Sequence, residues 1–587
     1  MKSGFDRETL LAEYQKARAE AKKLLGDPER LEALLASAEE KLSRGTKADS
    51  PLAALRDVIA LTRAYADGSY TDVPSFAVPG MLGAVVYYAA PNDLIPDMVP
   101  FAGYTDDAAL TELMLELEGA ELERWRRGGT GREDGFLRRA PHELGIPESA
   151  LTRMLADIAA SHRDVHSVMV LRGDAIALEY YFEPYTADTA HAMYSASKTV
   201  TSMCVGIAAG KGLLSLTDPV APFFSGTLFQ NTVYMDRMKI HDLLCMGTGH
   251  SEDTFGHMAE AGGSWANTFL NQPVEHEPGT HFIYNTGATY MLGRILTKVT
   301  GKSLLDLADE WIFRRIGVKR PVWLTCPEGY AMAGLGLYLT ARDMAKFGML
   351  IMNGGRWNGE QVIPEDYIRL ASSKQIDNSA PSNDTDINWH VGYGYQMWRC
   401  SYDAFRADGL GGQYIVMMPE KELMFVFTDS LGTEAPYPLH LAEDVLSEVS
   451  DEPVPAGTLT LPAQKKLDRA YLPELGAEYV FEENAAGLKS IAMTDDTLTV
   501  RIKKTTLTLP YAGGRTVRSE TLVNWMGVAP KNRLMTTVWS EDRLYIRVNE
   551  YTEPATLLLA LSFSGADVTG EMRFTMGSSA KVIGKKA

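Results

Sequence analysis

The spacing of apolar residues changes twice along the chain and predicts three kinds of structure. Over residues 1–128, apolar positions recur every three or four residues among charged ones, which predicts an all-helical domain. Residues 150–452 mix strand-like and helical runs. Residues 459–587 alternate apolar and polar positions, as in Leu498-Thr-Val-Arg-Ile502, and this predicts an antiparallel β domain.

A glycine-rich, charged stretch at 129–149 and a proline-rich stretch at 453–458 separate these regions, and we expect both to be linkers. Inside the middle region, turn residues interrupt short runs rich in β-branched and aromatic side chains. The strands predicted there are 166–172, 175–182, 414–418 and 423–428, and the predicted helices include 151–160 and 439–449.

The most informative chemistry lies at the start of an apolar helical run, 199–210. The four residues before it, Ser195-Ala-Ser-Lys198, place a hydroxyl and an amine one helical turn apart on the same face. A buried lysine with a lowered pKa can take a proton from serine and so turn the hydroxyl into a nucleophile. The same spacing occurs at Ser578-Ser-Ala-Lys581 without an apolar helix behind it, and Ser195 or Ser197 could instead be a helix N-cap.

Two later segments carry further candidate groups. A Pro-Gly turn leads to Tyr284 just before another apolar helix, where the phenol either carries a proton or fills the core. The consecutive glycines Gly411-Gly412 precede a strand, which favours close approach of backbone or ligand but also suits a tight turn. Trp389, Tyr393 and Trp398 precede these glycines and either line an acyl pocket or belong to the core.

Composition narrows the partners of this chain. A net charge of −19 over 587 residues argues against nucleic acid or an anionic membrane as the main partner.

The four cysteines are far apart and match neither a disulfide framework nor a metal motif, so we expect them to be reduced. Charges near the N-terminus do not suit a signal peptide, so we expect a cytoplasmic protein. The apolar segment 76–91 leaves a peripheral membrane contact open, and the oligomeric state is also open.

Several ordered motifs between about 150 and 450 resemble those of the serine β-lactamase and penicillin-binding-protein superfamily. The likeness is greatest to its class C-like branch of esterases, D-amino-acid peptidases and 6-aminohexanoate-oligomer hydrolases. The motifs are Ser195-Ala-Ser-Lys198, His241–His250, Pro278-Gly279 with Tyr284-Asn-Thr-Gly287, and Gly409-Leu-Gly-Gly-Gln413. This resemblance implies a three-layer α/β sandwich with an antiparallel sheet and a helical subdomain, with the site between them.

The resemblance also implies roles for residues of this chain. Ser195 would be the acylated nucleophile, and Lys198 and Tyr284 would share the proton transfer. The backbone amides of Ser195 and Gln413 would form the oxyanion hole. The residues that would contact the substrate are Asn285, Gly411 and Gly412. The resemblance implies no metal and no cofactor.

Two departures from the family pattern narrow the substrate. The family's tyrosine and asparagine are two positions apart, whereas Asn285 directly follows Tyr284. Where the family has a lysine or histidine, this chain has Leu410-Gly-Gly412, so no cation there holds a substrate carboxylate. We therefore expect a small, neutral ester or amide as substrate. The alternative is a non-catalytic sensor or scaffold with a degenerate third motif.

A second resemblance lies within the helical domain. The stretch Asp93-Leu-Ile-Pro-Asp97, followed by Gly103-Tyr-Thr-Asp-Asp107, is similar to a small bacterial domain family of unknown function. Its four aspartates either bind a hard cation through their oxygens or cap helices and turns beside the prolines.

Overall fold

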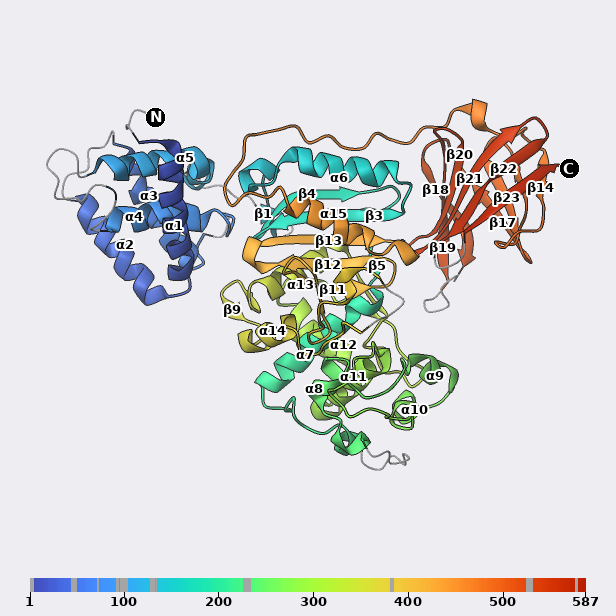
Figure 1. The fold of residues 1–587 in the computed structure, drawn as a ribbon, viewed down its shortest axis with the longest axis horizontal. Coiled ribbons are helices and arrows are strands. Elements are labelled where there is room, and N and C mark those ends of the chain that lie inside the picture. The colour runs from blue at the N-terminus through green and yellow to red at the C-terminus, as the bar shows by residue number, and fades with distance from the viewer. Residues whose placement is uncertain are drawn as a thin grey trace.

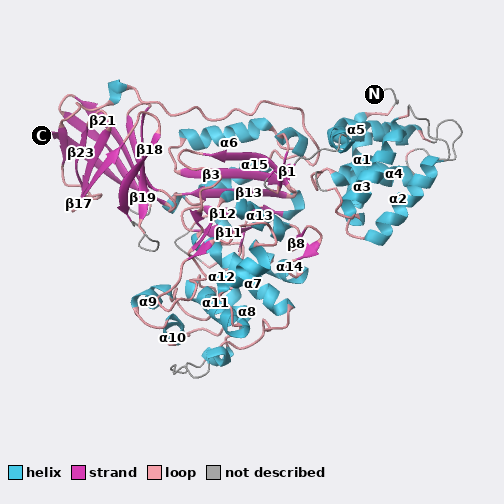
Figure 2. Ribbon diagram, turned by 180° about the vertical axis from the view of Figure 1, so that it is seen from behind, coloured by secondary structure: helices cyan, strands magenta, loops and turns pink. Residues whose placement is uncertain are grey.

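The chain folds as three parts that lie in a row, and each part has hydrophobic clusters of its own. A helical part at the N-terminus and a β part at the C-terminus flank a larger α/β part, seen from the front in Figure 1 and from behind in Figure 2. The computed structural model describes residues 5–43, 50–70, 73–90, 94, 104–126, 132–133, 135–224, 234–380, 385–523, 531–575 and 579–587.

The described residues of the N-terminal part form helices, as the spacing of its apolar residues predicts. The α-helices are α1 (Arg7–Leu24), α2 (Pro28–Ser43), α3 (Ala54–Ala66), α4 (Val78–Ala89) and α5 (Thr105–Arg126). Helix α4 is buried on nearly all sides because α1, α2, α3 and α5 pack around it. Internal packing therefore accounts for residues 76–90 of the apolar segment for which the sequence leaves a membrane contact open.

An eight-stranded sheet is the frame of the central part. Its strands in sheet order are β1 (Arg132–Glu133), β2 (Phe136–Arg138), β4 (Ala175–Tyr181), β3 (Val165–Arg172), β13 (Leu423–Asp429), β12 (Gln413–Met418), β11 (Phe405–Gly409) and β10 (Trp398–Arg399). Strands β3, β4, β12 and β13 confirm the four predicted strands, each with one end moved by one residue. The β2–β4 pair is parallel, which corrects the expectation of a wholly antiparallel sheet. No hairpin joins β2 to β4. The chain passes through α6 and β3 between these two strands, so they can run in the same direction.

Helices cover both faces of this sheet. On one face α6 (Glu148–Ala160) packs against α15 (Tyr437–Leu446), which confirms both predicted helices. On the other face α13 (Ala341–Met352) packs against β3, β12 and β13. Successive residues of β12 join alternate clusters, with Tyr414 on the α6 side and Ile415 on the α13 side. The result is the three-layer arrangement that the resemblance implies.

A group of helices beyond the β11 edge of the sheet completes the central part (Figure 1). Its α-helices are α7 (Ser197–Gly210), α8 (Ile240–Leu244), α9 (Phe255–Glu260), α10 (Trp265–Leu270), α11 (Thr286–Thr300), α12 (Leu304–Ala308) and α14 (Glu365–Ser372). Helix α7 is buried along nearly its whole length because it contacts α11, α12, α14 and strand β11. The start of α7 therefore lies where the helices meet the sheet.

Ten antiparallel strands form the C-terminal part, as the alternating pattern predicts. In sheet order they are β17 (Thr505–Pro510), β16 (Thr497–Ile502), β15 (Leu488–Met493), β14 (Glu478–Phe481), β23 (Ser579–Lys586), β22 (Asp567–Phe574), β21 (Ala555–Ser564), β20 (Leu544–Glu550), β19 (Asn532–Ser540) and β18 (Thr516–Val523). The edge strands β17 and β18 contact each other, so the sheet is nearly closed around an apolar interior.

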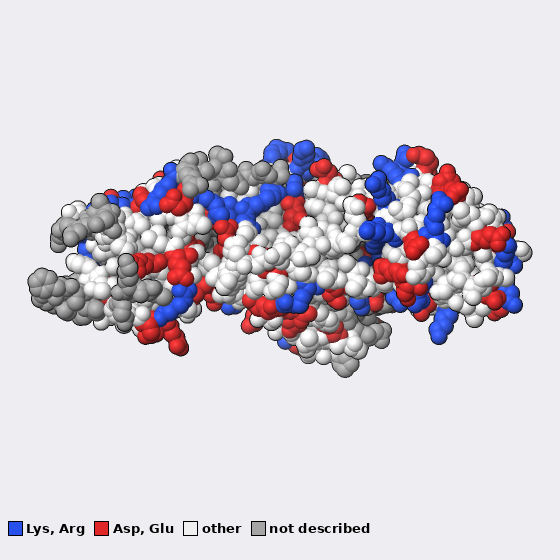
Figure 3. All heavy atoms as spheres, turned by 90° about the horizontal axis from the view of Figure 1, so that it is seen from above, with Lys and Arg blue, Asp and Glu red and all other residues white. Residues whose placement is uncertain are grey.

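Surface charge, cysteines and helix lengths add to what the composition indicates. On the face seen in Figure 3, acidic and basic side chains are interspersed over all three parts, so the net negative charge does not form one patch there. All four cysteines are buried and carry free thiols. Within the described residues, no helix combines the length and the apolarity that a membrane span needs.

The packing of α7 against α14 can be tested at Gly206, where a Cβ would lie 2.3 Å from the ring of Tyr367. Gly206→Ala should lower the free energy of unfolding by about 1–3 kcal/mol, although alanine is the better helix former. Gly119→Ala in α5 is the matched control because its Cβ would meet only Leu115, at 3.9 Å. The control should raise stability by up to about 1 kcal/mol. Calorimetric melting measures both effects, and stabilisation by both substitutions would contradict the packing described.

Candidate active site

The chain makes a tight turn immediately before α7. Strand β5 (His191–Ala192) pairs with β7 (Leu337–Leu339), and a 3-10 turn, Tyr194–Ala196, leads into the helix. Tyr194 has a φ of +42°, a conformation that costs a non-glycine residue about 1–3 kcal/mol. Ser195 follows directly, so the candidate nucleophile belongs to a turn that its surroundings must hold in place.

The amine of Lys198 contacts the hydroxyl of Ser195. Lys198 Nζ lies 2.8 Å from Ser195 Oγ and donates a second hydrogen bond to the carbonyl of Gly334 at 2.9 Å. The Lys198 side chain is almost fully buried, and this desolvation lowers its pKa to about 7. Near neutral pH a large fraction of the amine is therefore uncharged and able to accept a proton.

Tyr284 lies on the other side of this amine. Lys198 Nζ is 4.9 Å from the centre of the Tyr284 ring, which stacks on Trp398 at 5.3 Å. Burial raises the pKa of the phenol above its ordinary value, while hydrogen bonding with Ser195 lowers it. Tyr393 packs edge-on against both rings, so the structure brings together two of the three aromatic residues proposed for an acyl pocket with Tyr284 itself.

Two carboxylates near this group have no signal in the sequence motifs. Asp253 accepts hydrogen bonds from the amides of Phe255 at 3.0 Å and Thr286 at 2.8 Å, which place it at the start of α11. Asp408, on β11, accepts a hydrogen bond from Arg406 Nε at 2.8 Å. Both carboxylates raise the pKa of Lys198, against the effect of burial. The site is therefore acidic on two sides, which sequence reasoning alone missed.

Asn285 is the N-cap of α11 in this structure. Its Oδ1 accepts hydrogen bonds from Gly287 N at 3.0 Å and from Thr254 Oγ1 at 2.8 Å, and the residue is fully buried. An asparagine directly before a helical run is a strong N-cap signal, and this signal was available in the sequence. Asn285 thus has a capping role in this structure, and its expected contact with the substrate stays a prediction.

The paired glycines form the turn that joins β11 to β12. Gly412 N donates to Gly409 O at 3.1 Å, and Gly411, with a φ of +83°, occupies the position that requires glycine in a type II turn. A Cβ on Gly411 would lie 2.6 Å from Pro554, and one on Gly412 would lie 2.8 Å from Asp429 Oδ2. The Cβ positions of both glycines thus face protein atoms, and the expected contact of these glycines with the substrate stays a prediction.

Gly409 is the glycine that lies against the turn Tyr194–Ala196, which contains the candidate nucleophile and is called the nucleophile turn below. A Cβ on it would lie 2.2 Å from Met193 O and 3.3 Å from Ala196 N. Gln413, the expected oxyanion donor, pairs with Gly409 across the hairpin, and its side chain donates to Asp429 O at 2.6 Å. Leu410 directly follows Gly409 and is the first residue after β11.

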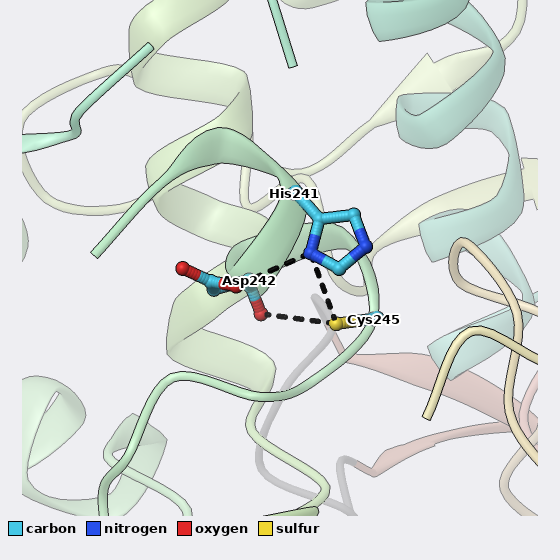
Figure 4. A group of neighbouring side chains, drawn as sticks. All are labelled: His241, Asp242 and Cys245. Atoms are coloured by element: carbon cyan, nitrogen blue, oxygen red, sulfur yellow. Dashed lines mark hydrogen bonds and ion pairs between the residues drawn. The ribbon is translucent and has the colours of Figure 1, made fainter. Parts of the chain in front are cut away.

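Among the described residues, one group has the ligand types of a metal site. His241 Nδ1, a carboxylate oxygen of Asp242 and Cys245 Sγ all lie within 4.8 Å of one another. Figure 4 shows that they already interact, with Nδ1 3.2 Å from Asp242 Oδ1 and 3.8 Å from Sγ. The hydrogen bond to Asp242 raises the pKa of His241 to about 10, so the imidazolium itself balances the carboxylate. Asp242 Oδ2 also caps α8 by accepting from Lys239 N at 2.9 Å.

The aspartates of the N-terminal resemblance are only partly described. Asp93 and Asp97 lie outside the described residues. Asp106 and Asp107 are buried in the first turn of α5, where Asp106 accepts a hydrogen bond from the Tyr87 hydroxyl at 3.0 Å. This contact is with a side chain and is not a helix cap, so the choice between capping and cation binding stays open for the set.

Comparison with known families agrees with this geometry. The beta-lactamase family matches residues 151–445, which is half of the chain. The chain belongs to the beta-lactamase family. The match covers the helical group, every strand of the central sheet except β1 and β2, and all the candidate site residues of this family member. A protein family of unknown function, DUF1232, matches residues 80–113 in the N-terminal part.

Individual relatives are distant. The 6-aminohexanoate-dimer hydrolase of Paenarthrobacter ureafaciens is 22% identical over 306 residues, which cover 49% of this chain and 78% of the relative. The octameric penicillin-binding protein homologue from Pyrococcus abyssi has a TM-score of 0.41 and 15% identity, covering 74% of this chain and 99% of its own. EstCE1, a hydrolase with promiscuous acyltransferase activity, has a TM-score of 0.42 and 15% identity, covering 51% and 99%.

The state of Lys198 can be tested through its effect on stability. Because burial lowers its pKa from 10.5 to about 7, the unfolded chain binds more protons than the folded chain between these pH values. The stability that Lys198 contributes should rise by about 1.4 kcal/mol per pH unit across this window, be complete above it and be lost as the pH falls through 7.

The measurement is the difference in unfolding free energy between wild type and Lys198→Met at pH 7, 8 and 9. Lys211→Met, at the exposed residue after α7, is the control and should give a difference that hardly changes with pH. The same flat profile for Lys198→Met would contradict a desolvated amine.

Proposed function

We propose that this chain is a serine hydrolase that forms an acyl-enzyme on Ser195 and acts on a small ester or amide. The observation that carries the proposal is the 2.8 Å contact between Lys198 Nζ and Ser195 Oγ at a buried amine whose pKa is lowered to about 7. A base must hold no proton when it takes one, and burial provides this condition near neutral pH.

In the proposed reaction, the proton of the Ser195 hydroxyl moves first to Lys198, and a proton then moves to the leaving group. As Ser195 Oγ bonds to the acyl carbon, its proton passes to the Lys198 amine. The resulting ammonium returns a proton through Tyr284 to the leaving oxygen or nitrogen as that bond breaks. Water attacks the acyl-serine by the same route in reverse, which releases the acid and restores the hydroxyl. The raised pKa of Tyr284 keeps the phenol protonated between transfers.

Two backbone amides would stabilise the oxyanion of the tetrahedral intermediate. The first is the amide of Ser195, as the resemblance implies. For the second we favour Leu410 over Gln413, because Leu410 directly follows the glycine that packs on the Ser195 turn. Gln413 is instead paired with Gly409 in the β11–β12 ladder.

The charges around the site support a neutral substrate. Asp253 and Asp408 act on both Lys198 and Tyr284, and Arg406 balances the charge of Asp408, so a substrate carboxylate there would meet like charge chiefly from Asp253. This agrees with the absence of a cation at Leu410-Gly-Gly412.

The nucleophile is tested by intact-mass analysis after treatment with a fluorophosphonate. We expect one covalent adduct on the wild type and none on Ser195→Ala, because the phosphonylated atom is Ser195 Oγ. Lys198→Ala should slow labelling and p-nitrophenyl ester hydrolysis by about 100- to 10,000-fold through loss of the base. Ser197→Ala, at the other serine of the motif, is the matched control for a hydroxyl that is not the nucleophile.

The ester panel also separates enzyme from scaffold. Turnover of neutral p-nitrophenyl esters, with poorer turnover of esters that carry an acyl-chain carboxylate, is the expected result. An acyl adduct that persists without turnover would favour the non-catalytic sensor, and equal labelling of wild type and Ser195→Ala would remove Ser195 as the nucleophile.

The oxyanion donor can be tested by removing a single backbone N–H. Leu410 is the second residue of the type II turn, a position that proline favours, so Leu410→Pro should keep the turn and delete the amide hydrogen. We expect kcat to fall by about 100-fold or more, as for the loss of an oxyanion donor in other hydrolases. Leu410→Ala keeps the amide and should change kcat little. Unchanged kcat in Leu410→Pro would return the role to Gln413.

A further inference from the structure

One turn of the C-terminal part lies against both loops that frame Ser195. It joins β20 to β21 and consists of Tyr551–Pro554. The carbonyl of Thr552 accepts a hydrogen bond from Ala192 N at 3.0 Å, just before the nucleophile turn. Pro554 packs on Gly411, in the turn that also contains the proposed oxyanion donor. Neighbouring residues of one short turn thus touch the two segments whose separation sets the geometry of the site.

Glu553 makes the central contacts of this turn. Its Oε2 accepts a hydrogen bond from the Tyr194 hydroxyl at 2.7 Å, and its Oε1 accepts one from the Tyr338 hydroxyl. Glu553 and Tyr194 are buried, so both hydrogen bonds are shielded from water. A carboxylate that accepts from two phenols forms charge-assisted bonds, which are about twice as strong as neutral ones. Tyr338 is on β7 and pairs with Ala192, so Glu553 ties the strand and the nucleophile turn together.

A buried polar network fixes the hairpin that carries this turn. Arg547 on β20 pairs with Asp164 at 3.2 Å, and Asn549 Nδ2 donates to the same carboxylate at 2.6 Å. Asp164 directly precedes β3 of the central sheet, and Thr556 on β21 also donates to it. Because these contacts surround the turn on both of its strands, the position of Glu553 is set by the central sheet and not by the C-terminal part alone.

We propose that Glu553 is a positioning residue for Ser195, supplied by the C-terminal part of the chain and acting through the hydroxyl of Tyr194. The proposal rests on the proposed function, because it concerns the reactivity of the same serine. Tyr194 has a φ of +42° and immediately precedes Ser195, so its backbone relaxes unless its side chain is held. Relaxation at this residue moves the Ser195 amide and Oγ relative to Lys198 Nζ, and misplacement by about 1 Å costs a reaction about 100-fold.

The experiment compares full-length Glu553→Gln, Tyr194→Phe and the double variant with wild type. Both substitutions keep the size of the side chain and remove part of the carboxylate–phenol bond. We expect each single variant to lose about 10- to 100-fold in fluorophosphonate labelling rate and in kcat, with KM nearly unchanged. The double variant should be no slower than the slower single variant, because both act through one contact. Glu571→Gln, at a half-buried glutamate of the same sheet, is the control and should match wild type.

Each outcome bears on a separate claim. If wild type is not labelled on Ser195, the proposed function fails, whatever Glu553 does. If wild type is labelled and Glu553→Gln is labelled at the same rate, the positioning role is overturned. Effects that simply multiply in the double variant overturn action through Tyr194. Thermal melting gives the folded fraction of each variant. If a variant is labelled more slowly only because less of it is folded, and its folded molecules are labelled at the wild-type rate, the positioning role is also overturned.

Discussion

The desolvated amine of Lys198 against Ser195 Oγ is the interaction on which the rest of the site depends. Burial removes the water that would favour the ammonium, and among the described residues the amine has two close polar contacts, Ser195 Oγ and Gly334 O. Asp253 and Asp408 act in the opposite direction, so the pKa settles near 7 and not lower. An amine whose pKa is near 7 can accept a proton at neutral pH and can also donate it again.

That balance requires tight packing around α7, and small residues make the packing possible. Gly206 lets the ring of Tyr367 lie on the helix, and Gly409 lets strand β11 approach the turn before it. A side chain at either position would push apart the helix and the strand that enclose the amine. The desolvation of one lysine is thus a property of the junction between sheet and helices, since no single element produces it.

Local patterns in the sequence predict those parts of the site that lie within a few residues of one another. Ser195 and Lys198 are one helical turn apart, and the apolar run behind them predicts the burial of Lys198. The β strands follow from alternation and turn residues in the same way. Asn285 also carried a readable signal, as an asparagine directly before a helix, but the family pattern suggested substrate contact instead. Local patterns therefore predict helices, strands and residue spacing well. They predict the role of a polar side chain such as Asn285 less well.

Other parts of the site depend on contacts that no local pattern encodes. Asp253 and Asp408 reach Lys198 from a loop and a strand that are distant in sequence, and each looks like an ordinary surface acid when read alone. The pair Gly411-Gly412 suggested ligand approach, yet its close neighbours are Pro554 and the carboxylate of Asp429. The sequence indicates that something must come close to these glycines, and only the fold shows that it is another part of the chain.

The contact between Tyr194 and Glu553 joins residues 359 positions apart, and it has a consequence for the order of events during synthesis. Ser195 and Lys198 leave the ribosome long before Glu553 does. Translation adds about 5–20 residues per second, so the nucleophile turn waits for tens of seconds without its carboxylate support. A nascent chain thus lacks this contact beside its candidate nucleophile until residue 553 has been made, so the full geometry of the site forms only once the β20–β21 turn is present.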